Sequence, residues 1–150
     1  MSERKEDPRV LDELVNSMMH LLAVFPKKLI RMEEIQKAYD LTYYQILSLF
    51  LIAERDLTLT EMSDTLGVSK PNLNPLVKSL ESKGMIVRWR SPKDRRKMMI
   101  RLSEEGKQCH SQLKQYILEE MTLLKTEVSH QEIEVINTSL RSFNRILDRM

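Results

Sequence analysis

Residues 57–102 read LTLTEMSDTLGVSKPNLNPLVKSLESKGMIVRWRSPKDRRKMMIRL and contain two short helical patterns followed by two strand-like patterns. In the first helical pattern, Thr58 and Glu61 stand three apart as a capping box, and a glycine follows the last apolar residue. Ser69 can cap the second helix, which carries an apolar stripe and is again followed by a glycine. Two helices joined by a tight glycine-containing turn are typical of a helix-turn-helix.

Two short apolar runs follow, at 86–90 and 98–102, and a polar segment that contains a proline separates them. Runs of β-branched, aromatic and other apolar residues on either side of a polar turn are typical of a β-hairpin. The sequence therefore predicts a two-stranded hairpin over 86–102 with an exposed tip. A helix-turn-helix followed by such a hairpin is the layout of a winged-helix DNA-binding region.

Positive charge is concentrated in the same segment. From Lys78 to Arg101 there are nine lysines and arginines against two acidic residues, whereas the whole chain has a formal net charge of +2. The rest of the chain is therefore net acidic. Such an asymmetry is typical of a surface that docks phosphates and releases counterions. Charges that serve only solubility are the alternative, but charge, turn and hairpin coincide in one segment, and this favours nucleic-acid binding.

Together with its continuation LSEEGK, this segment resembles the multiple-antibiotic-resistance regulator (MarR) family of bacterial winged-helix transcription factors. The most specific resemblance is at the hairpin tip. The family typically carries Asp-x-Arg there, and this chain has Asp94, Arg95 and Arg96 before an apolar strand. The length of the chain and its helical flanks extend the resemblance over nearly all of the sequence.

Helical patterns precede the winged segment. Apolar residues recur at helical spacing over 10–25, with the helix ending near Pro26, and 28–39 reads as a second, less regular helix. Thr42 and Gln45 then form another capping box, at the start of a strongly apolar helix. This helix is expected to be the buried base of the DNA-binding lobe.

Helical patterns also follow the winged segment. Ser103 can cap a long helix that ends before Ser129, and the final helix carries apolar residues from Ile133 to Met150 at spacings of three and four. A seam this far from the winged core needs a partner. The first helix could supply it within the chain, but the resemblance implies that the N- and C-terminal helices of two subunits interlock. Such a twofold homodimer also suits palindromic DNA.

The predicted fold class is mainly α with a small β-hairpin wing, as one MarR-type unit over 1–150. A winged helix-turn-helix at 41–103 lies between helical dimerisation regions at 8–40 and 104–150. The composition, 41% hydrophobic and 31% charged, is that of a globular protein. No signal peptide or bilayer-spanning run is expected, and one cysteine forms no internal disulfide, so a bacterial or archaeal cytosolic location is predicted.

The recognition helix, 69–83, is expected to enter the major groove by its N-terminal half. Ser69 and Lys70 stand where a positive helix end favours phosphate, and the amides of Asn72 and Asn74 can pair with adenine edges. The alternative is that Asn72 only caps the helix and Asn74 faces water.

Two prolines, Pro71 and Pro75, stand close together in this helix. If Ser69 is the cap, Pro75 lies beyond the first turn, where it removes a hydrogen bond and should kink or delay the helix. If the helix starts at Asn72, Pro75 falls harmlessly in its first turn. Many family members carry arginine at the position of Pro75, so the resemblance implies that one base contact is missing here. A·T-rich half-sites are therefore expected.

The wing, 86–102, is expected to reach a minor groove, where a narrow A·T-rich channel attracts a guanidinium. By resemblance Arg96 is the inserted residue and Asp94 orients it, and a turn-forming role for Asp94 is compatible with this. Phosphate contacts are expected from the other basic side chains of the recognition helix and wing, which are Lys78, Arg88, Arg90, Lys93, Arg95 and Lys97.

The resemblance implies that a small aromatic or phenolic molecule, an oxidant or a metal ion moves the two DNA-binding lobes and releases the promoter. Six residues are candidates for the walls of the effector pocket, and ordinary packing would also explain their apolar or aromatic character. They are Met18, His20, Phe25, Tyr39, Tyr44 and Tyr116. Cys109 lacks an electropositive setting and is expected to be inert, and the scattered histidines do not pair as in helical zinc sites. No metal or cofactor is therefore expected.

The sequence thus predicts a homodimeric, sequence-specific transcriptional regulator, a repressor that an effector releases from a palindromic operator. One alternative is a winged helix that binds an acidic protein partner, and another is non-specific architectural DNA binding. The chain has no Gly-rich phosphate loop, nucleophile elbow or acid–base constellation, so an enzyme is not expected.

Overall fold

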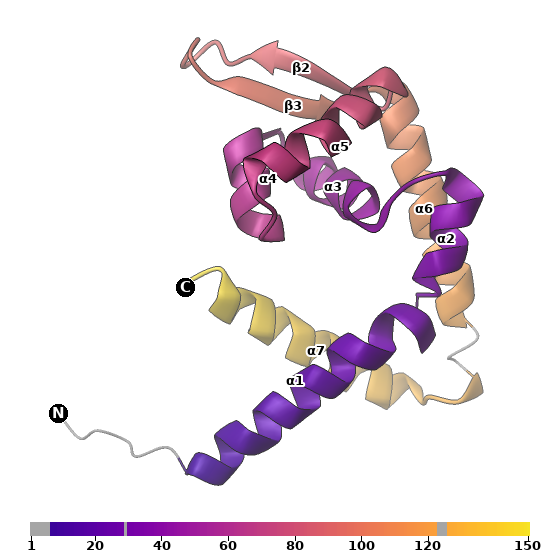
Figure 1. Ribbon diagram of the computed structural model, residues 1–150. Coiled ribbons are helices and arrows are strands. Elements are labelled where there is room, and N and C mark those ends of the chain that lie inside the picture. The colour runs from indigo at the N-terminus through magenta and orange to yellow at the C-terminus, as the bar shows by residue number, and fades with distance from the viewer. Residues whose placement is uncertain (1–6, 29, 123–125) are drawn as a thin grey trace, which may run out of the picture.

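The computed structural model describes residues 7–28, 30–122 and 126–150. Over these residues the chain forms seven helices and three strands (Figure 1). In chain order they are α1 (Pro8–Lys28), α2 (Met32–Tyr39), α3 (Tyr43–Glu54), β1 (Leu57–Thr58), α4 (Leu59–Leu66), α5 (Lys70–Ser82), β2 (Ile86–Arg90), β3 (Met98–Leu102), α6 (Glu104–Thr122) and α7 (His130–Leu147). We call α3, α4, α5 and the sheet the winged lobe. Figure 1 shows α6 descending from this lobe towards α1 and α7.

Helix α4 begins and ends where the sequence predicts. The Thr58 hydroxyl accepts a hydrogen bond from the Glu61 N–H (3.1 Å), and the Glu61 carboxylate accepts one from the Thr58 N–H (2.8 Å). Gly67 ends the helix in the left-handed conformation, at a φ of 64°, where a residue with a Cβ would be strained. The predicted capping box and glycine stop are confirmed.

Helix α5 starts at Lys70, directly after Ser69, and continues to Ser82 without interruption. Pro75 therefore lies beyond the first turn of the helix, as expected if Ser69 is the cap. The start of the helix is not delayed, however. Ser69 occupies the N-cap position without making a side-chain capping hydrogen bond. Because Pro75 has no N–H, the carbonyl of Pro71 receives no helical hydrogen bond from it.

The predicted hairpin is confirmed. Strands β2 and β3 pair antiparallel from Ile86 opposite Leu102 to Arg90 opposite Met98. Strand β1 adds a third strand on the other side of β3, with Leu57 opposite Ile100. The sequence analysis missed β1 because two residues are too few to show a strand periodicity.

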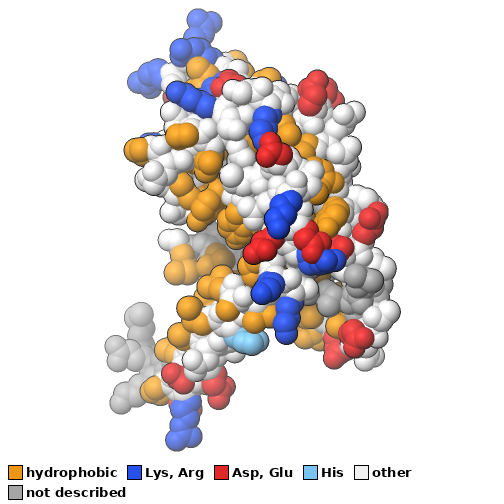
Figure 2. Space-filling model, turned by 45° about the vertical axis from the view of Figure 1, so that its right-hand side comes forward, with side chains coloured by type: hydrophobic (Ala, Val, Ile, Leu, Met, Phe, Trp, Pro, Cys, Tyr) orange, Lys and Arg blue, Asp and Glu red, His pale blue; other side chains and the backbone are white. Residues whose placement is uncertain are grey.

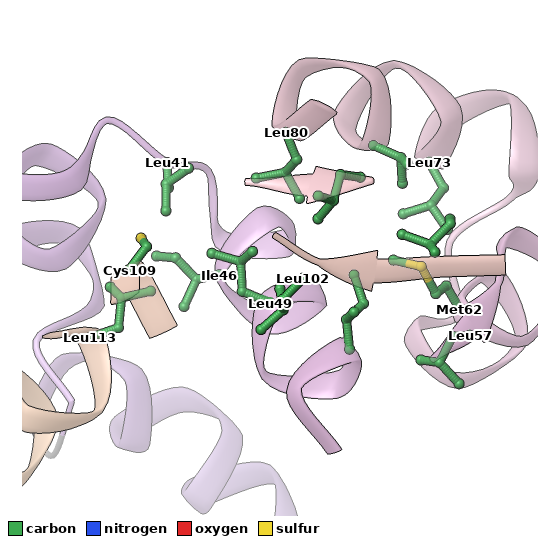
Figure 3. Close-up of a cluster of buried hydrophobic side chains, with 14 of the residues drawn as sticks. Leu41, Ile46, Leu49, Leu57, Met62, Leu73, Leu80, Leu102, Cys109 and Leu113 are labelled. Carbon is green, nitrogen blue, oxygen red and sulfur yellow. The ribbon is translucent and has the colours of Figure 1, made fainter. Parts of the chain in front are cut away.

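The winged lobe is built around a continuous apolar core, part of which Figure 3 shows. Helix α3 contributes Ile46 and Leu49, both fully buried, so its prediction as the buried base of the lobe is confirmed. The predicted capping box of α3 is also present. Its Gln45 is buried and donates a further hydrogen bond to the Leu76 carbonyl (3.3 Å), which ties the start of α3 to α5.

The start of α6 packs closely against the turn between α5 and β2. The Ser103 hydroxyl accepts from the Gly106 N–H (3.0 Å) and donates to the Gly84 carbonyl, so the predicted cap is confirmed. A Cβ added at Gly106 would lie 1.9 Å from the carbonyl oxygen of Met85. Glycine at position 106 is therefore required for this close approach, a role that the sequence alone did not reveal.

The two helices that precede α3 differ from their predicted bounds. Helix α1 runs past Pro26 to Lys28, so its predicted end near the proline was wrong by about one half-turn. Helix α2 begins at Met32 rather than at residue 28, because Arg31 adopts the left-handed conformation (φ 47°) and cannot continue a right-handed helix.

Helices α1 and α7 bury no residue within this chain. Their large apolar side chains are exposed, for example Leu22 on α1 (66%) and Leu140 on α7 (46%). Figure 2 shows such side chains, in orange, along the arm that leads to the N-terminal residues drawn in grey. The alternative in which α1 covers the C-terminal seam of its own chain is therefore wrong. None of the described helices is long and apolar enough to cross a membrane.

Candidate nucleic-acid interface

Helix α5 has a buried face and a polar exposed face. Its apolar stripe, which includes Leu73, points into the core, whereas Ser69, Lys70, Asn72 and Lys78 are exposed. Asn74 is half-buried. The N-terminal half of the helix thus presents a hydroxyl, an ammonium and an amide to solvent, which are groups that can bind phosphates and base edges.

The tip of the wing is a turn organised by Asp94. Its backbone carbonyl accepts from the Lys97 N–H (2.9 Å). Its carboxylate accepts from the Arg96 backbone N–H (3.1 Å) and from Arg96 Nε (3.4 Å). Asp94 therefore both shapes the turn and orients the guanidinium of Arg96, whose side chain is 93% exposed. This is the geometry that the resemblance implied for the pair.

Most basic side chains of the segment fall into two groups. Four of them form ion pairs, which are Lys83 with Asp40 (3.0 Å), Arg88 with Glu81 (3.2 Å), Arg96 with Asp94 (3.4 Å) and Arg101 with Asp56 (2.8 Å). Another set is exposed and, within the part of the chain that the structure describes, forms no ion pair, namely Lys78, Lys93, Arg95 and Lys97. Blue side chains project from the top of the molecule in Figure 2, where Figure 1 places the wing.

Two predicted phosphate contacts have partners within the chain. Arg88 is half-buried beside Glu81, and its Nη2 is buried without a hydrogen-bond acceptor among the described residues. Arg90 donates through Nη1 to the Arg95 carbonyl (3.0 Å) and so braces the wing loop. Arg88 thus joins β2 to α5 and Arg90 supports the wing loop, roles that the sequence did not indicate.

The six predicted effector residues do not form one pocket. Tyr39 and Tyr116 meet edge to face, with ring centroids 6.5 Å apart, and so join α2 to α6. Tyr44 is exposed and packs against Tyr43 (5.3 Å) rather than against the other tyrosines. The remaining three lie on α1, where Met18 and His20 are exposed and Phe25 is half-buried.

A hollow of about 400 Å³ lies instead at the end of α1, along α2 and at the start of α3. Its lining includes Tyr43, Met32 and Arg31, but none of the six predicted residues. The hydrogen bond from Arg31 to Glu120 (3.2 Å), together with the one to Glu34, raises the pKa of this guanidinium. Sequence periodicity places Tyr43 and Tyr44 on one helix but does not show which of them faces a hollow.

Cys109 is buried in the core, and the neighbouring residue His110 is half-buried. Burial raises the pKa of the Cys109 thiol, an effect that the charge of Lys83 only partly opposes, so the reactive thiolate is disfavoured as expected. The ring of His110 packs against Phe50 (4.7 Å), and burial, with the charge of Lys114, lowers its pKa. Among the described residues no cluster of three or more His, Cys, Asp or Glu side chains could hold a metal ion.

A helix-turn-helix with a basic hairpin wing, set between long helices, defines a protein of the winged-helix class. Comparison with known proteins agrees with this class. The chain belongs to the SarA/Rot family of transcriptional regulators, whose sequence pattern matches residues 30–113. It is also 32% identical over 108 residues, 71% of this chain and 72% of the relative, to the HTH-type transcriptional regulator SarZ of Staphylococcus aureus strain USA300.

Solved structures with the same fold include MarR-family regulators. A MarR family protein from Bacillus stearothermophilus superposes with a TM-score of 0.77 at 24% identity, over 95% of this chain and 99% of that one. The regulator BldR from Sulfolobus solfataricus gives a TM-score of 0.71 at 21% identity, over 93% and 98%. A MarR mutant from E. coli, determined in complex with operator DNA, gives 0.66 at 22% identity, over 92% and 99%. The predicted fold class and the MarR resemblance are confirmed.

Proposed function

We propose that this regulator binds palindromic operator DNA as a homodimer and acts as a repressor in the cytosol. The observation that carries the proposal is the exposed guanidinium of Arg96 at the tip of a basic wing, oriented by Asp94 (3.4 Å). A narrow minor groove attracts a guanidinium, and the contact with Asp94 reduces the conformational entropy that the Arg96 side chain loses on insertion. The operator complex of the MarR mutant from E. coli, a structure of the same fold, supports DNA as the ligand.

Helix α5 then lies in the major groove with its N-terminal half against the bases. Asn72, which is exposed, is the better supported reader of adenine, and Asn74, which is half-buried, contributes less surface. Ser69 and Lys70 bind phosphate at the start of the helix. Pro75 presents no hydrogen-bond donor to guanine, so the half-sites are A·T-rich.

The unpaired basic side chains supply the phosphate contacts. On the wing these are Lys93, Arg95 and Lys97, and on α5 Lys78 is the corresponding group. The internal partners of Arg88 and Arg90 support a structural role for these two residues in place of the phosphate contact expected from the sequence.

The dimer forms through α1 and α7, within the proposed dimerisation regions 8–40 and 104–150. Exposed apolar patches of this extent are rare on monomeric proteins and mark interaction surfaces. Both helices are without a buried residue in the single chain, and both are amphipathic. Interlocking of two copies would bury these faces and set the distance between two winged lobes.

An effector that releases the DNA would bind in the hollow at α1, α2 and α3. Met32 and Tyr43 offer an apolar and aromatic wall, and Lys27 offers positive charge, which suits a small aromatic or phenolic molecule. We propose no catalytic activity and no resident cofactor. A winged helix that binds an acidic protein is the second candidate, favoured only by the charge of the wing.

Replacing Arg96 by alanine is expected to weaken specific binding about tenfold or more, because the minor-groove contact is lost. The measurement is a fluorescence-anisotropy titration with a selected duplex at two salt concentrations. Lys107→Ala serves as the control, since it removes one positive charge from an exposed site on α6. Equal affinities for Arg96→Ala and the control would rule out insertion of the wing.

A further inference from the structure

Arg101 is the most tightly held basic residue of the wing strands. Its Nε and Nη2 both donate to Oδ2 of Asp56, at 3.0 and 2.8 Å. Its guanidinium carbon also lies 4.1 Å from the centroid of the Trp89 ring. Hydrogen bonds between charged groups are stronger than neutral ones, and stacking on an aromatic face adds to them. Arg101 is therefore fixed on two sides.

The strand register places Trp89 and Arg101 on one face of the hairpin. Arg101 pairs with Val87 and Trp89 with Met99, so all four side chains point away from the core face, which carries Ile100. The indole Nε1 is buried and has no acceptor among the described residues. The ring is thus held by the overlying guanidinium rather than by a hydrogen bond of its own.

Asp56 lies at the point where the helix-turn-helix meets the sheet. The preceding residue, Arg55, pairs with Glu61 (3.1 Å), the acidic member of the α4 capping box with Thr58. The hydrogen bond from the Thr58 backbone lowers the pKa of Glu61, so this carboxylate stays ionised. The side chains of the consecutive residues Arg55 and Asp56 therefore hold the start of α4 and the wing strand β3, respectively. Both elements are thus joined to the same short segment between α3 and β1.

Small rotations of the wing about this segment would be amplified at its tip. Arg96 precedes Arg101 by five residues, and at about 3.3 Å per residue an extended chain of that length spans roughly 16 Å. A rotation of about 10° would then displace the tip by roughly 3 Å, which is the length of a hydrogen bond. Contact of the wing with a groove thus depends on how firmly the strands are anchored.

We propose that Arg101, held between Asp56 and Trp89, is a positioning residue that sets the wing relative to the recognition helix and contacts no phosphate itself. The inference rests on the proposed function, because it assumes that α5 and Arg96 engage neighbouring grooves together. The charge of Arg101 is already matched by Asp56, whereas Lys93, Arg95 and Lys97 carry unpaired charges at the tip.

The substitution Asp56→Asn tests the proposal, because the proposal and the electrostatic field alone predict opposite changes in DNA affinity. Removing an acidic residue from a protein that binds a polyanion strengthens binding through the electrostatic field alone. If Asp56 anchors the wing through Arg101, the same substitution weakens specific binding, by about tenfold, because a charge-assisted contact is lost. In an Arg96→Ala background the second substitution should cause no further weakening, since the wing contact is already absent.

Arg101→Lys provides the second variant, because lysine keeps the charge but cannot make the forked contact. Its affinity should fall about as far as that of Asp56→Asn. A lysine still binds phosphate as a point charge, so a direct phosphate contact at position 101 predicts a nearly unchanged affinity for Arg101→Lys.

Two controls establish that each variant is folded and that the contact is broken. The chain has one tryptophan, so Trp89 emission reports directly on loss of the overlying guanidinium. Far-UV circular dichroism of each variant at the binding temperature shows that the fold is kept. Equal or tighter DNA binding by Asp56→Asn, or an unchanged affinity of Arg101→Lys, would overturn the inference while the proposed function stands. Failure of the unaltered protein to bind any selected duplex would overturn both.

Discussion

Replacing Leu140 by glutamate is expected to convert the protein to a monomer and to lower its affinity for a two-half-site operator by at least about a hundredfold. Leu140 belongs to the apolar seam of α7 and is 46% exposed in the single chain. A carboxylate buried in a dimer interface without a partner costs several kcal/mol. Loss of the dimer also removes the gain in affinity that comes from binding two half-sites at once.

The change in mass is measured by sedimentation velocity, and the affinity by anisotropy with the same operator. Thr138→Glu is the matched control, because residue 138 lies about 200° around the helix from residue 140 and is outside the seam. The control should remain dimeric. A Leu140→Glu protein that sediments as the dimer would contradict the proposed interface.

Replacing Gly106 by alanine is expected to lower the free energy of unfolding by about 3 kcal/mol. Alanine in a helix is ordinarily more stable than glycine by about 1 kcal/mol, so local propensity alone predicts the opposite sign. The added Cβ, however, would lie 1.9 Å from the Met85 carbonyl oxygen, and this oxygen belongs to backbone that cannot rotate away. Either α6 or the turn before β2 must move, which also disturbs the cap formed by Ser103.

The stability is measured by urea unfolding followed by circular dichroism. Glu105→Ala, at the exposed neighbouring position, is the control and should change the stability by no more than about 0.5 kcal/mol. An unchanged midpoint of urea unfolding for Gly106→Ala would show that α6 does not approach the turn before β2 this closely.

Features that depend on neighbouring residues could be predicted from the sequence. The capping boxes at Thr42 and Thr58 each involve residues three apart, and both are present. The hairpin and the Asp94 turn are equally local, and the structure contains both. Strand β1 escaped prediction because its pairing partner, β3, lies about forty residues further along the chain.

The candidate site was less predictable where it depends on long-range contacts. All nine basic residues from Lys78 to Arg101 counted equally in the charge balance, but Lys83 and Arg101 have partners 43 and 45 residues away. Such pairs cannot be recognised from spacing. The hollow beside α2 was missed for the same reason, since its lining comes from three helices, α1, α2 and α3, whose packing no local pattern indicates.

The most direct test of the proposed function is selection of binding sites from a pool of randomised duplexes, followed by anisotropy titrations of the recovered sequences at two salt concentrations. A homodimeric winged-helix regulator should enrich an inverted repeat of A·T-rich half-sites whose centres lie about 10 base pairs apart, and its affinity should fall steeply with salt. Recovery of no enriched sequence, or of sites without twofold symmetry, would contradict operator recognition by a dimer and favour the basic wing as a surface for a protein partner.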